Sequence, residues 1–252
     1  MSVIHIEHLT RDYGDNKGVF DLSFDIDRGE VFGFLGPNGA GKTTTIRHLL
    51  GFLRPRQGLV EINNLRVWDN YADILKDVGY IPGEIAFFDK MNGLEYLRFI
   101  QQYRKDDADR MKELIDMFEL NPRVKIKKMS KGMKQKVGIV QAFMHDPDIL
   151  ILDEPTSGLD PLMQQLFIEL LAKEKRRGKT ILLSSHMFEE VEKTCDRIGI
   201  IRNGRMVALS TVEELRKRYV HNYTVKLDSE AQAEAFARDF KGERVGLIAA
   251  IL

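Results

Sequence analysis

Apolar residues follow two patterns along the chain, and each pattern predicts one type of element. Near the N-terminus they alternate with polar residues over 3–6 and 22–26, which is typical of half-buried strands. Four short apolar runs farther along have the length of buried strands, at residues 31–35, 149–152, 180–183 and 198–201. Helical patterns separate these runs, so the sequence predicts an α/β fold with a mainly parallel sheet.

The block between Pro82 and Asp146 has the spacing of helices rather than strands. Its apolar residues recur three or four positions apart, at Leu94, Leu97, Phe99, Ile100, Met111, Leu114, Ile115 and Phe118. Because this block interrupts the strands, we expect a helical subdomain over about 84–145.

The pattern weakens after residue 210. It indicates a helix over 211–219, a strand over 223–227 and a second helix over 230–240, before an apolar tail, VGLIAAIL. We therefore expect one domain over 1–210 and a C-terminal accessory segment over 211–252. Because the sequence stops inside an apolar run, we expect that segment to be incomplete.

Composition narrows the possible partners. The 38 Lys and Arg residues balance the 38 Asp and Glu residues, so no net charge attracts nucleic acid or anionic lipid, and we expect no nucleic-acid partner. The single cysteine, Cys195, cannot form an internal disulfide, which favours a reducing compartment. No charge-free apolar run approaches the roughly 18 residues that a membrane helix needs, so another chain would supply any span.

The motif GPNGAGKTT follows the predicted strand at 31–35 and precedes a helical pattern. It fits G-x-x-x-x-G-K-[ST], the sequence of a phosphate-binding loop. Such a loop wraps backbone N–H groups around an anion at a helix N-terminus, and its lysine reaches the β- and γ-phosphates. The candidate nucleotide-binding residues are Gly36, Pro37, Asn38, Gly39, Ala40, Gly41, Lys42, Thr43 and Thr44. The Thr43 hydroxyl is the candidate Mg²⁺ ligand.

The motif ILILDEP supplies the carboxylates that such a loop requires. Its apolar run delivers Asp153 and Glu154 to the C-terminal edge of the sheet, where open α/β sheets bind ligands. We expect Asp153 to hold Mg²⁺, directly or through water, and Glu154 to activate the water that attacks the γ-phosphate.

His186 follows another apolar run, ILLSS, and should also emerge from a strand end. A lone histidine is usually structural. Since the loop, the carboxylates and the imidazole all lie at predicted strand ends, we favour a catalytic role beside the γ-phosphate.

These elements, in this order, resemble the ATP-binding cassette (ABC) family over nearly all of residues 2–210. The resemblance implies the ABC ATPase fold, which is a P-loop NTPase with a RecA-like core, an antiparallel β subdomain and a helical subdomain. MSKGMKQKV is similar to the family's signature segment, LSGGQ. Ser130 and Gly132 match it, whereas Lys131 and Met133 depart from it, as in the branch that pairs with bacterial exporter-type permeases.

The family resemblance assigns further residues. It implies that Ser130 and Gly132 complete the nucleotide site of a second ABC subunit and that Asp160, in SGLD, communicates across that interface. Tyr13 lies where the family stacks an aromatic on adenine, although packing is the alternative. The family's flexible-loop glutamine is missing from GYIPGE, where Gly83 or Glu84 replaces it, and we take Glu84 as the candidate metal contact.

The resemblance also implies a function and partners. It implies an ATPase subunit that uses ATP and Mg²⁺, closes as a dimer and powers a transmembrane permease from the cytoplasmic face of the membrane. Export is the direction that the branch favours. An ABC ATPase acting on DNA or on ribosomes is the alternative. The chain has neither the heptads nor the paired cysteines typical of the DNA-acting proteins, and it has one cassette where ribosome-acting proteins normally have two.

Overall fold

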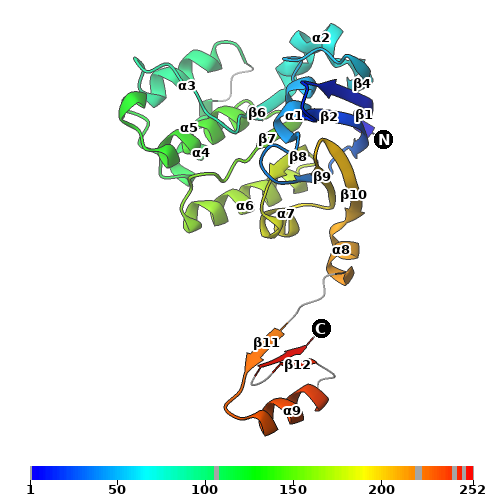
Figure 1. Ribbon diagram of the computed structural model, residues 1–252. Helices are drawn as coiled ribbons and strands as arrows, with labels where there is room; N and C mark the ends of the chain where they lie inside the picture. Colours follow the sequence, from blue (N-terminus) through cyan, green and yellow to red (C-terminus); the bar gives the residue numbers. More distant parts are fainter. Residues whose placement is uncertain (1, 105–107, 219–222, 240–242, 246–247, 252) are drawn as a thin grey trace. The chain divides into compact units, whose positions relative to one another are not determined.

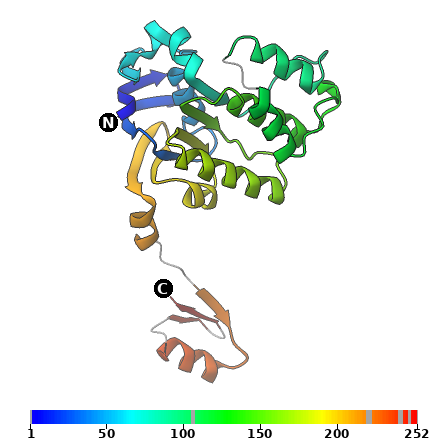
Figure 2. The same cartoon turned by 180° about the vertical axis from the view of Figure 1, so that it is seen from behind.

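The computed structural model describes residues 2–104, 108–218, 223–239, 243–245 and 248–251, and Figures 1 and 2 show it from opposite sides. The chain divides into two compact units, Met1–Ser210 and Thr211–Leu252. The first unit contains two sheets and the second unit contains one, and each unit is described separately.

The centre of the first unit is a six-stranded sheet with the order β10-β9-β3-β8-β7-β6. The four apolar runs form its middle strands, β3 (Val31–Leu35), β7 (Ile149–Asp153), β8 (Thr180–Ser185) and β9 (Arg197–Arg202). Neighbouring strands from β9 to β6 are parallel, as expected. The two edge strands, β6 (Val78–Ile81) and β10 (Arg205–Thr211), were not predicted.

An antiparallel sheet forms the second layer, with the order β2-β1-β4-β5. Its strands are β1 (Ser2–Asp12), β2 (Gly18–Asp27), β4 (Gln57–Ile62) and β5 (Leu65–Arg66). The apolar faces of the two sheets meet in one core, where the Phe24 and Phe32 rings stack with centroids 5.2 Å apart. This packing fixes the antiparallel sheet against the strand that precedes the phosphate loop.

Helices pack against the strands of both sheets. The contacts pair α1 (Lys42–Leu49) with β4 and β7, and α7 (Phe188–Thr194) with β3 and β8. Helix α6 (Pro161–Arg176) contacts α7, and α2 (Val67–Ile74) with the short helix η1 (Leu75–Asp77) leads into β6.

The block predicted to be helical contains α3 (Gly93–Gln101), α4 (Ala108–Met117), the short helix η2 (Ile126–Lys128) and α5 (Lys131–Phe143). In Figures 1 and 2 these helices gather at one side of the unit, away from the antiparallel sheet. Asn92 and Glu95 form a reciprocal capping box at the start of α3. A buried ion pair between Arg110 of α4 and Glu174 of α6 connects this group of helices to α6.

The second unit has the elements α8 (Val212–Arg218), β11 (Tyr223–Lys226), α9 (Glu230–Asp239), β12 (Glu243–Val245) and β13 (Ile248–Ile251). The described parts of the predicted helices and strand match α8, β11 and α9, whereas residues 219 and 240 lie outside the described residues. Its sheet is antiparallel with the order β11-β13-β12, and α9 packs on it.

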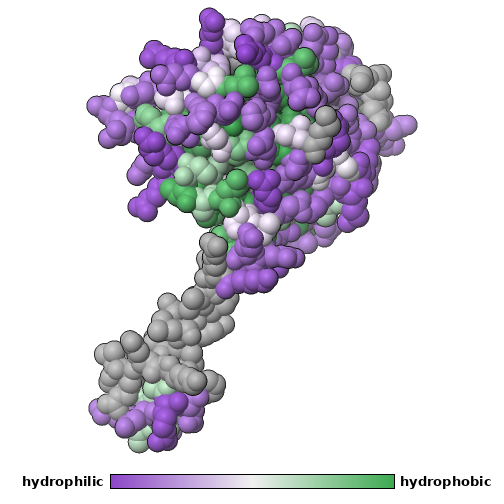
Figure 3. All heavy atoms as spheres, turned by 90° about the vertical axis from the view of Figure 1, so that its right-hand side faces the viewer, coloured by the Kyte–Doolittle hydropathy of each residue, from purple (hydrophilic) through white to green (hydrophobic). Residues whose placement is uncertain are grey.

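The surface is mainly polar where Figure 3 views the first unit, with apolar side chains in several places among the polar ones. The edge strand β10 alternates, and its Val207 and Leu209 side chains are exposed. Within the described residues, no helix has the length and apolar character needed to cross a bilayer.

Candidate active site

The phosphate loop joins the end of β3 to the first turn of α1. Gly41 is the N-cap of α1 with φ of 112°, a conformation that other residues rarely adopt. A Cβ atom on Gly36 would come within 2.4 Å of the Ile201 carbonyl oxygen on β9. Both positions therefore need glycine, and together they turn the backbone so that the N-terminus of α1 faces the cleft described below.

Lys42 is almost fully buried, at 5% exposure, and its ammonium group lies inside the loop. Its Nζ atom donates to the carbonyl oxygens of Gly36 (2.6 Å) and Pro37 (3.2 Å). The same atom is 3.3 Å from Glu154 Oε1. The loop thus concentrates a positive charge and the helix N-terminus at one point, which suits a phosphate group.

A cleft of about 430 Å³ lies over the loop. Its volume is in the range that small-molecule sites occupy. The lining residues are Tyr13, Lys17, Gly18, Asn38, Gly39, Ala40, Gly41, Lys42, Thr43, Thr44 and Glu154. Tyr13 is half exposed, at 52%, at the rim of a short turn in which its N–H donates to the Lys17 carbonyl. Lys17 and Gly18 escaped the sequence analysis because no motif marks them, and only the pairing of β1 with β2 brings them here.

Thr43 and Asp153 meet where a metal ion would be held. Thr43 Oγ1 donates to Asp153 Oδ2 at 2.8 Å, and the Ser184 hydroxyl donates to Asp153 Oδ1. Neighbouring ligands of an octahedral Mg²⁺ with 2.0–2.1 Å bonds are about 2.9 Å apart, so this oxygen pair fits the ion. Across the described residues, no three His, Cys, Asp or Glu side chains gather as a metal site. Mg²⁺ needs none, because phosphate oxygens and water usually complete its shell.

The segment around Gly83 passes beside the Asp153 carboxylate. A Cβ atom on Gly83 would lie 3.3 Å from Asp153 Oδ2, so the backbone at 83 lies next to this carboxylate. Glu84 is exposed and is not among the residues that line the cleft. On β6, burial first and the Asp153 charge second raise the pKa of Tyr80 to about 12, so this phenol stays protonated.

Glu154 adopts a left-handed backbone conformation, with φ of 48°. This conformation costs a non-glycine residue roughly 1–2 kcal/mol, and such costs cluster at functional sites. Its N–H donates to the Ser184 carbonyl and hydroxyl oxygens, both at 3.2 Å. The side chain is 25% exposed, and His186 Nδ1 lies 3.4 Å from its Oε2 atom. The structure therefore brings Lys42, Glu154 and His186 together.

The segment that resembles the family signature lies elsewhere. Ser130 is the N-cap of α5, where its hydroxyl accepts from the Met133 N–H at 3.2 Å. A Cβ atom on Gly132 would be 2.7 Å from the Gly158 carbonyl oxygen, so α5 begins directly against the turn at 154–158. The Lys131 ammonium donates to the Ser157 hydroxyl at 2.8 Å.

Asp160 is the N-cap of α6, and its Oδ1 atom accepts from the Met163 N–H at 3.0 Å. Like Ser130 and Gly132, it does not line the cleft. Within one chain, Ser130 and Asp160 thus make helix-capping contacts, and none of the three residues lines the cleft that contains Lys42.

Comparison with known proteins places these features in context. Residues 19–157 match the sequence family described as "ABC transporter". The chain is 39% identical over 225 residues to the bacitracin transport ATP-binding protein BcrA of Bacillus licheniformis, covering 86% of this chain and 72% of BcrA. It is 34% identical over 240 residues to the linearmycin resistance ATP-binding protein LnrL of Bacillus subtilis, covering 93% of this chain and 77% of LnrL.

Solved structures show the same fold. An ATP-binding subunit of an ABC transporter superposes with a TM-score of 0.78 at 34% identity, over 86% of this chain and 93% of that chain. A dimeric ATP-binding cassette bound to ADP and Pi has a TM-score of 0.74 at 22% identity, over 83% of this chain and 98% of that chain. The second match concerns the fold alone.

Proposed function

The chain belongs to the ABC transporter family as an ATP-binding and ATP-hydrolysing subunit, and we propose that it drives transport by closing on a second ABC subunit around ATP. The observation that carries this proposal is the meeting of Lys42, Glu154 and His186 over one phosphate loop. The roles proposed below follow from that geometry.

The loop residues bind the triphosphate of ATP. Backbone N–H groups at the start of α1 surround the β- and γ-phosphates, and the Lys42 ammonium exchanges its carbonyl contacts for phosphate oxygens. Tyr13 lines the same cleft, and its exposed ring stacks on the adenine. These two anchors orient the γ-phosphate toward Glu154.

Glu154 acts as the general base, accepting a proton from the water that attacks the γ-phosphate. His186, beside the same carboxylate, donates to a γ-phosphate oxygen and orients it. Thr43 and Asp153 hold Mg²⁺, which neutralises charge on the β- and γ-phosphates when it is bound. Glu84 remains a candidate for a contact to this ion through water.

A second ABC subunit completes the site. The N-terminus of α5, with Ser130 and Gly132, is a positively polarised end that does not face the chain's own cleft. We assign it to the γ-phosphate of the ATP bound by the partner subunit. Asp160 is two residues beyond Gly158, whose carbonyl oxygen lies against Gly132, and we assign it to communication between the two sites.

A transmembrane permease is the proposed recipient of this motion. Tyr96 is buried and its hydroxyl donates to Gln141, so it packs inside the helical block. Phe88, by contrast, is 56% exposed while its ring contacts Tyr96 and Phe99. We assign Phe88 to the permease contact, which would hold the chain on the inner face of the cell membrane.

Export is the proposed direction of transport. It rests on the relatives named for bacitracin transport and linearmycin resistance and on the SKG variant of the signature segment. The nature of the cargo does not follow from these names, because related subunits serve different substrates.

The Glu154→Gln variant tests the function directly. The amide keeps the size of the side chain but cannot accept a proton, so ATP turnover should fall by about 10²- to 10⁴-fold. ATP affinity should stay near that of the parent chain, and a stable dimer should accumulate with ATP and Mg²⁺ in size-exclusion chromatography. Turnover close to the parent value would refute the assignment of Glu154 as the base.

A further inference from the structure

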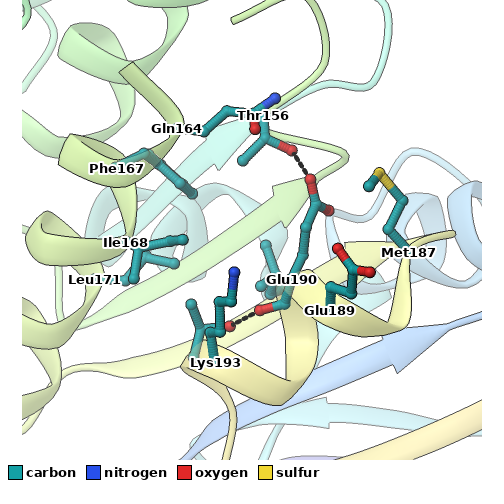
Figure 4. A pocket seen from close by; sticks show the side chains of 11 residues that line it. Thr156, Gln164, Phe167, Ile168, Leu171, Met187, Glu189, Glu190 and Lys193 are labelled. Atoms are coloured by element: carbon teal, nitrogen blue, oxygen red, sulfur yellow. Dashed lines mark hydrogen bonds between the residues drawn. The ribbon is translucent and has the colours of Figure 1, made fainter. Parts of the chain in front are cut away.

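Glu190 uses both of its carboxylate oxygens to join two separate parts of the active site. The Thr156 hydroxyl donates to Oε1, and the Ser185 hydroxyl donates to Oε2. Figure 4 shows the Glu190 side chain extending from α7 to Thr156, beside a cavity of about 80 Å³. No motif in the sequence marks this residue.

The first of these partners belongs to the turn that carries the base. Thr156 is two residues beyond Glu154, and the turn is closed by the Ser157 N–H, which donates to the Glu154 carbonyl at 3.1 Å. Because Glu154 has a left-handed backbone conformation, contacts around it must hold it there. The bond from Thr156 to Glu190 is one such contact.

The second partner belongs to the strand end that carries the histidine. Ser185 directly precedes His186 and is fully buried, whereas the His186 side chain is 50% exposed. The Ser185 carbonyl also accepts from the Gly36 N–H at 3.1 Å, at the first residue of the phosphate loop. The position of His186 is therefore set through the backbone at Ser185 rather than by packing around its ring.

We propose that Glu190 is a positioning residue for ATP hydrolysis, because one carboxylate holds the Glu154 turn and the His186 strand end at a fixed separation. This inference rests on the proposed roles of Glu154 and His186. Glu190 does not line the ATP cleft, so its effect is confined to the alignment of those two side chains. Displacing a catalytic group by about 1 Å can lower a rate by roughly 100-fold.

The test compares Glu190→Ala with Glu190→Gln in the full chain. Glu190→Ala removes both contacts, and kcat for ATP should fall by about 10- to 100-fold while the Kd for ATP changes less than about twofold. Glu190→Gln should recover most of the rate. Its amide accepts from one hydroxyl and donates to the other, and serine and threonine hydroxyls can do both.

The neighbouring Glu189→Ala provides the matched control. Glu189 lies on the same helix, lines the same cavity and is exposed, so its loss should leave kcat unchanged. If Glu190→Ala does not fold, Thr156→Val replaces it, because it removes only the bond to the Glu154 turn. It should lower kcat with ATP affinity unchanged.

Two results would overturn the inference. One is a parent-like kcat in the variant that lacks the contact. The other is a rate loss that Glu190→Gln does not recover, or one matched by an equal loss of ATP affinity. The Glu154→Gln variant separates the two proposals. If Glu154→Gln is inactive while Glu190→Ala is fully active, only the role proposed for Glu190 fails. If Glu154→Gln is active, the assignment of Glu154 as the base fails, and the role of Glu190 fails with it.

Discussion

Replacing Lys42 by methionine removes the ammonium group and keeps an unbranched side chain of similar length. The parent Nζ atom is buried and close to three oxygens, those of Gly36, Pro37 and Glu154. In our account these contacts give way to phosphate oxygens when ATP binds. The Lys42→Met variant should therefore bind ATP more weakly while the rest of the loop keeps its backbone.

The magnitude follows from the contact that is lost. A hydrogen bond to a charged group contributes about 1.5–3 kcal/mol, and about 1.4 kcal/mol corresponds to a tenfold change in Kd. The Kd for ATP should thus rise by roughly 10- to 100-fold. Thermal unfolding should also shift downward, since the Gly36 and Pro37 carbonyls lose their donor.

Isothermal titration calorimetry with ATP and Mg²⁺ measures this change. Lys76→Met is the control, because Lys76 is 70% exposed, pairs with Asp73 and does not line the cleft. The control should bind ATP like the parent chain. Equal affinity of Lys42→Met and the parent would refute the assignment of the loop to the triphosphate.

Two further predictions concern residues at the edges of the site. Tyr13→Ala should raise the Kd for ATP by roughly 5- to 100-fold, since stacking of a base on an aromatic ring contributes about 1–3 kcal/mol, while Tyr13→Phe should bind like the parent. An unchanged Kd for Tyr13→Ala would make this ring a packing residue. Gly132→Ala should destabilise the fold by about 1–3 kcal/mol, because its Cβ atom would lie 2.7 Å from the Gly158 carbonyl oxygen. Chemical denaturation checks this value against Lys134→Ala, and equal stability would show that the start of α5 adjusts freely.

The central strands were predictable because each has a simple pattern. β3, β7, β8 and β9 are continuous apolar runs, as buried parallel strands usually are. β6 is also mostly buried, but it has only four residues. It directly follows η1, so no turn signal separates it from the preceding helix. Glycine is required at position 79 of this strand because a Cβ atom there would lie 2.1 Å from the Ala142 carbonyl oxygen, a contact that only the tertiary structure reveals.

Sequence motifs point to the candidate catalytic and metal-binding residues, but not to the residues that hold them in place. Motifs identify Lys42, Asp153 and Glu154 because the chemistry requires those side chains at those spacings. Ser184 and Glu190 act through hydrogen bonds between elements far apart in the chain, which no local pattern records. The acidic stretch of α7 that contains Glu190 reads in the sequence as a solvent-exposed face.

A structure of the Glu154→Gln variant with ATP and Mg²⁺ tests the central claim most directly. Our account predicts the β- and γ-phosphates inside the loop at 36–44. It predicts Mg²⁺ about 2.1 Å from the Thr43 hydroxyl oxygen, with Asp153 contacting the Mg²⁺ ion directly or through one water. It also predicts Ser130 of the partner subunit against the γ-phosphate. ATP bound elsewhere, or a loop with no phosphate in it, would contradict the account.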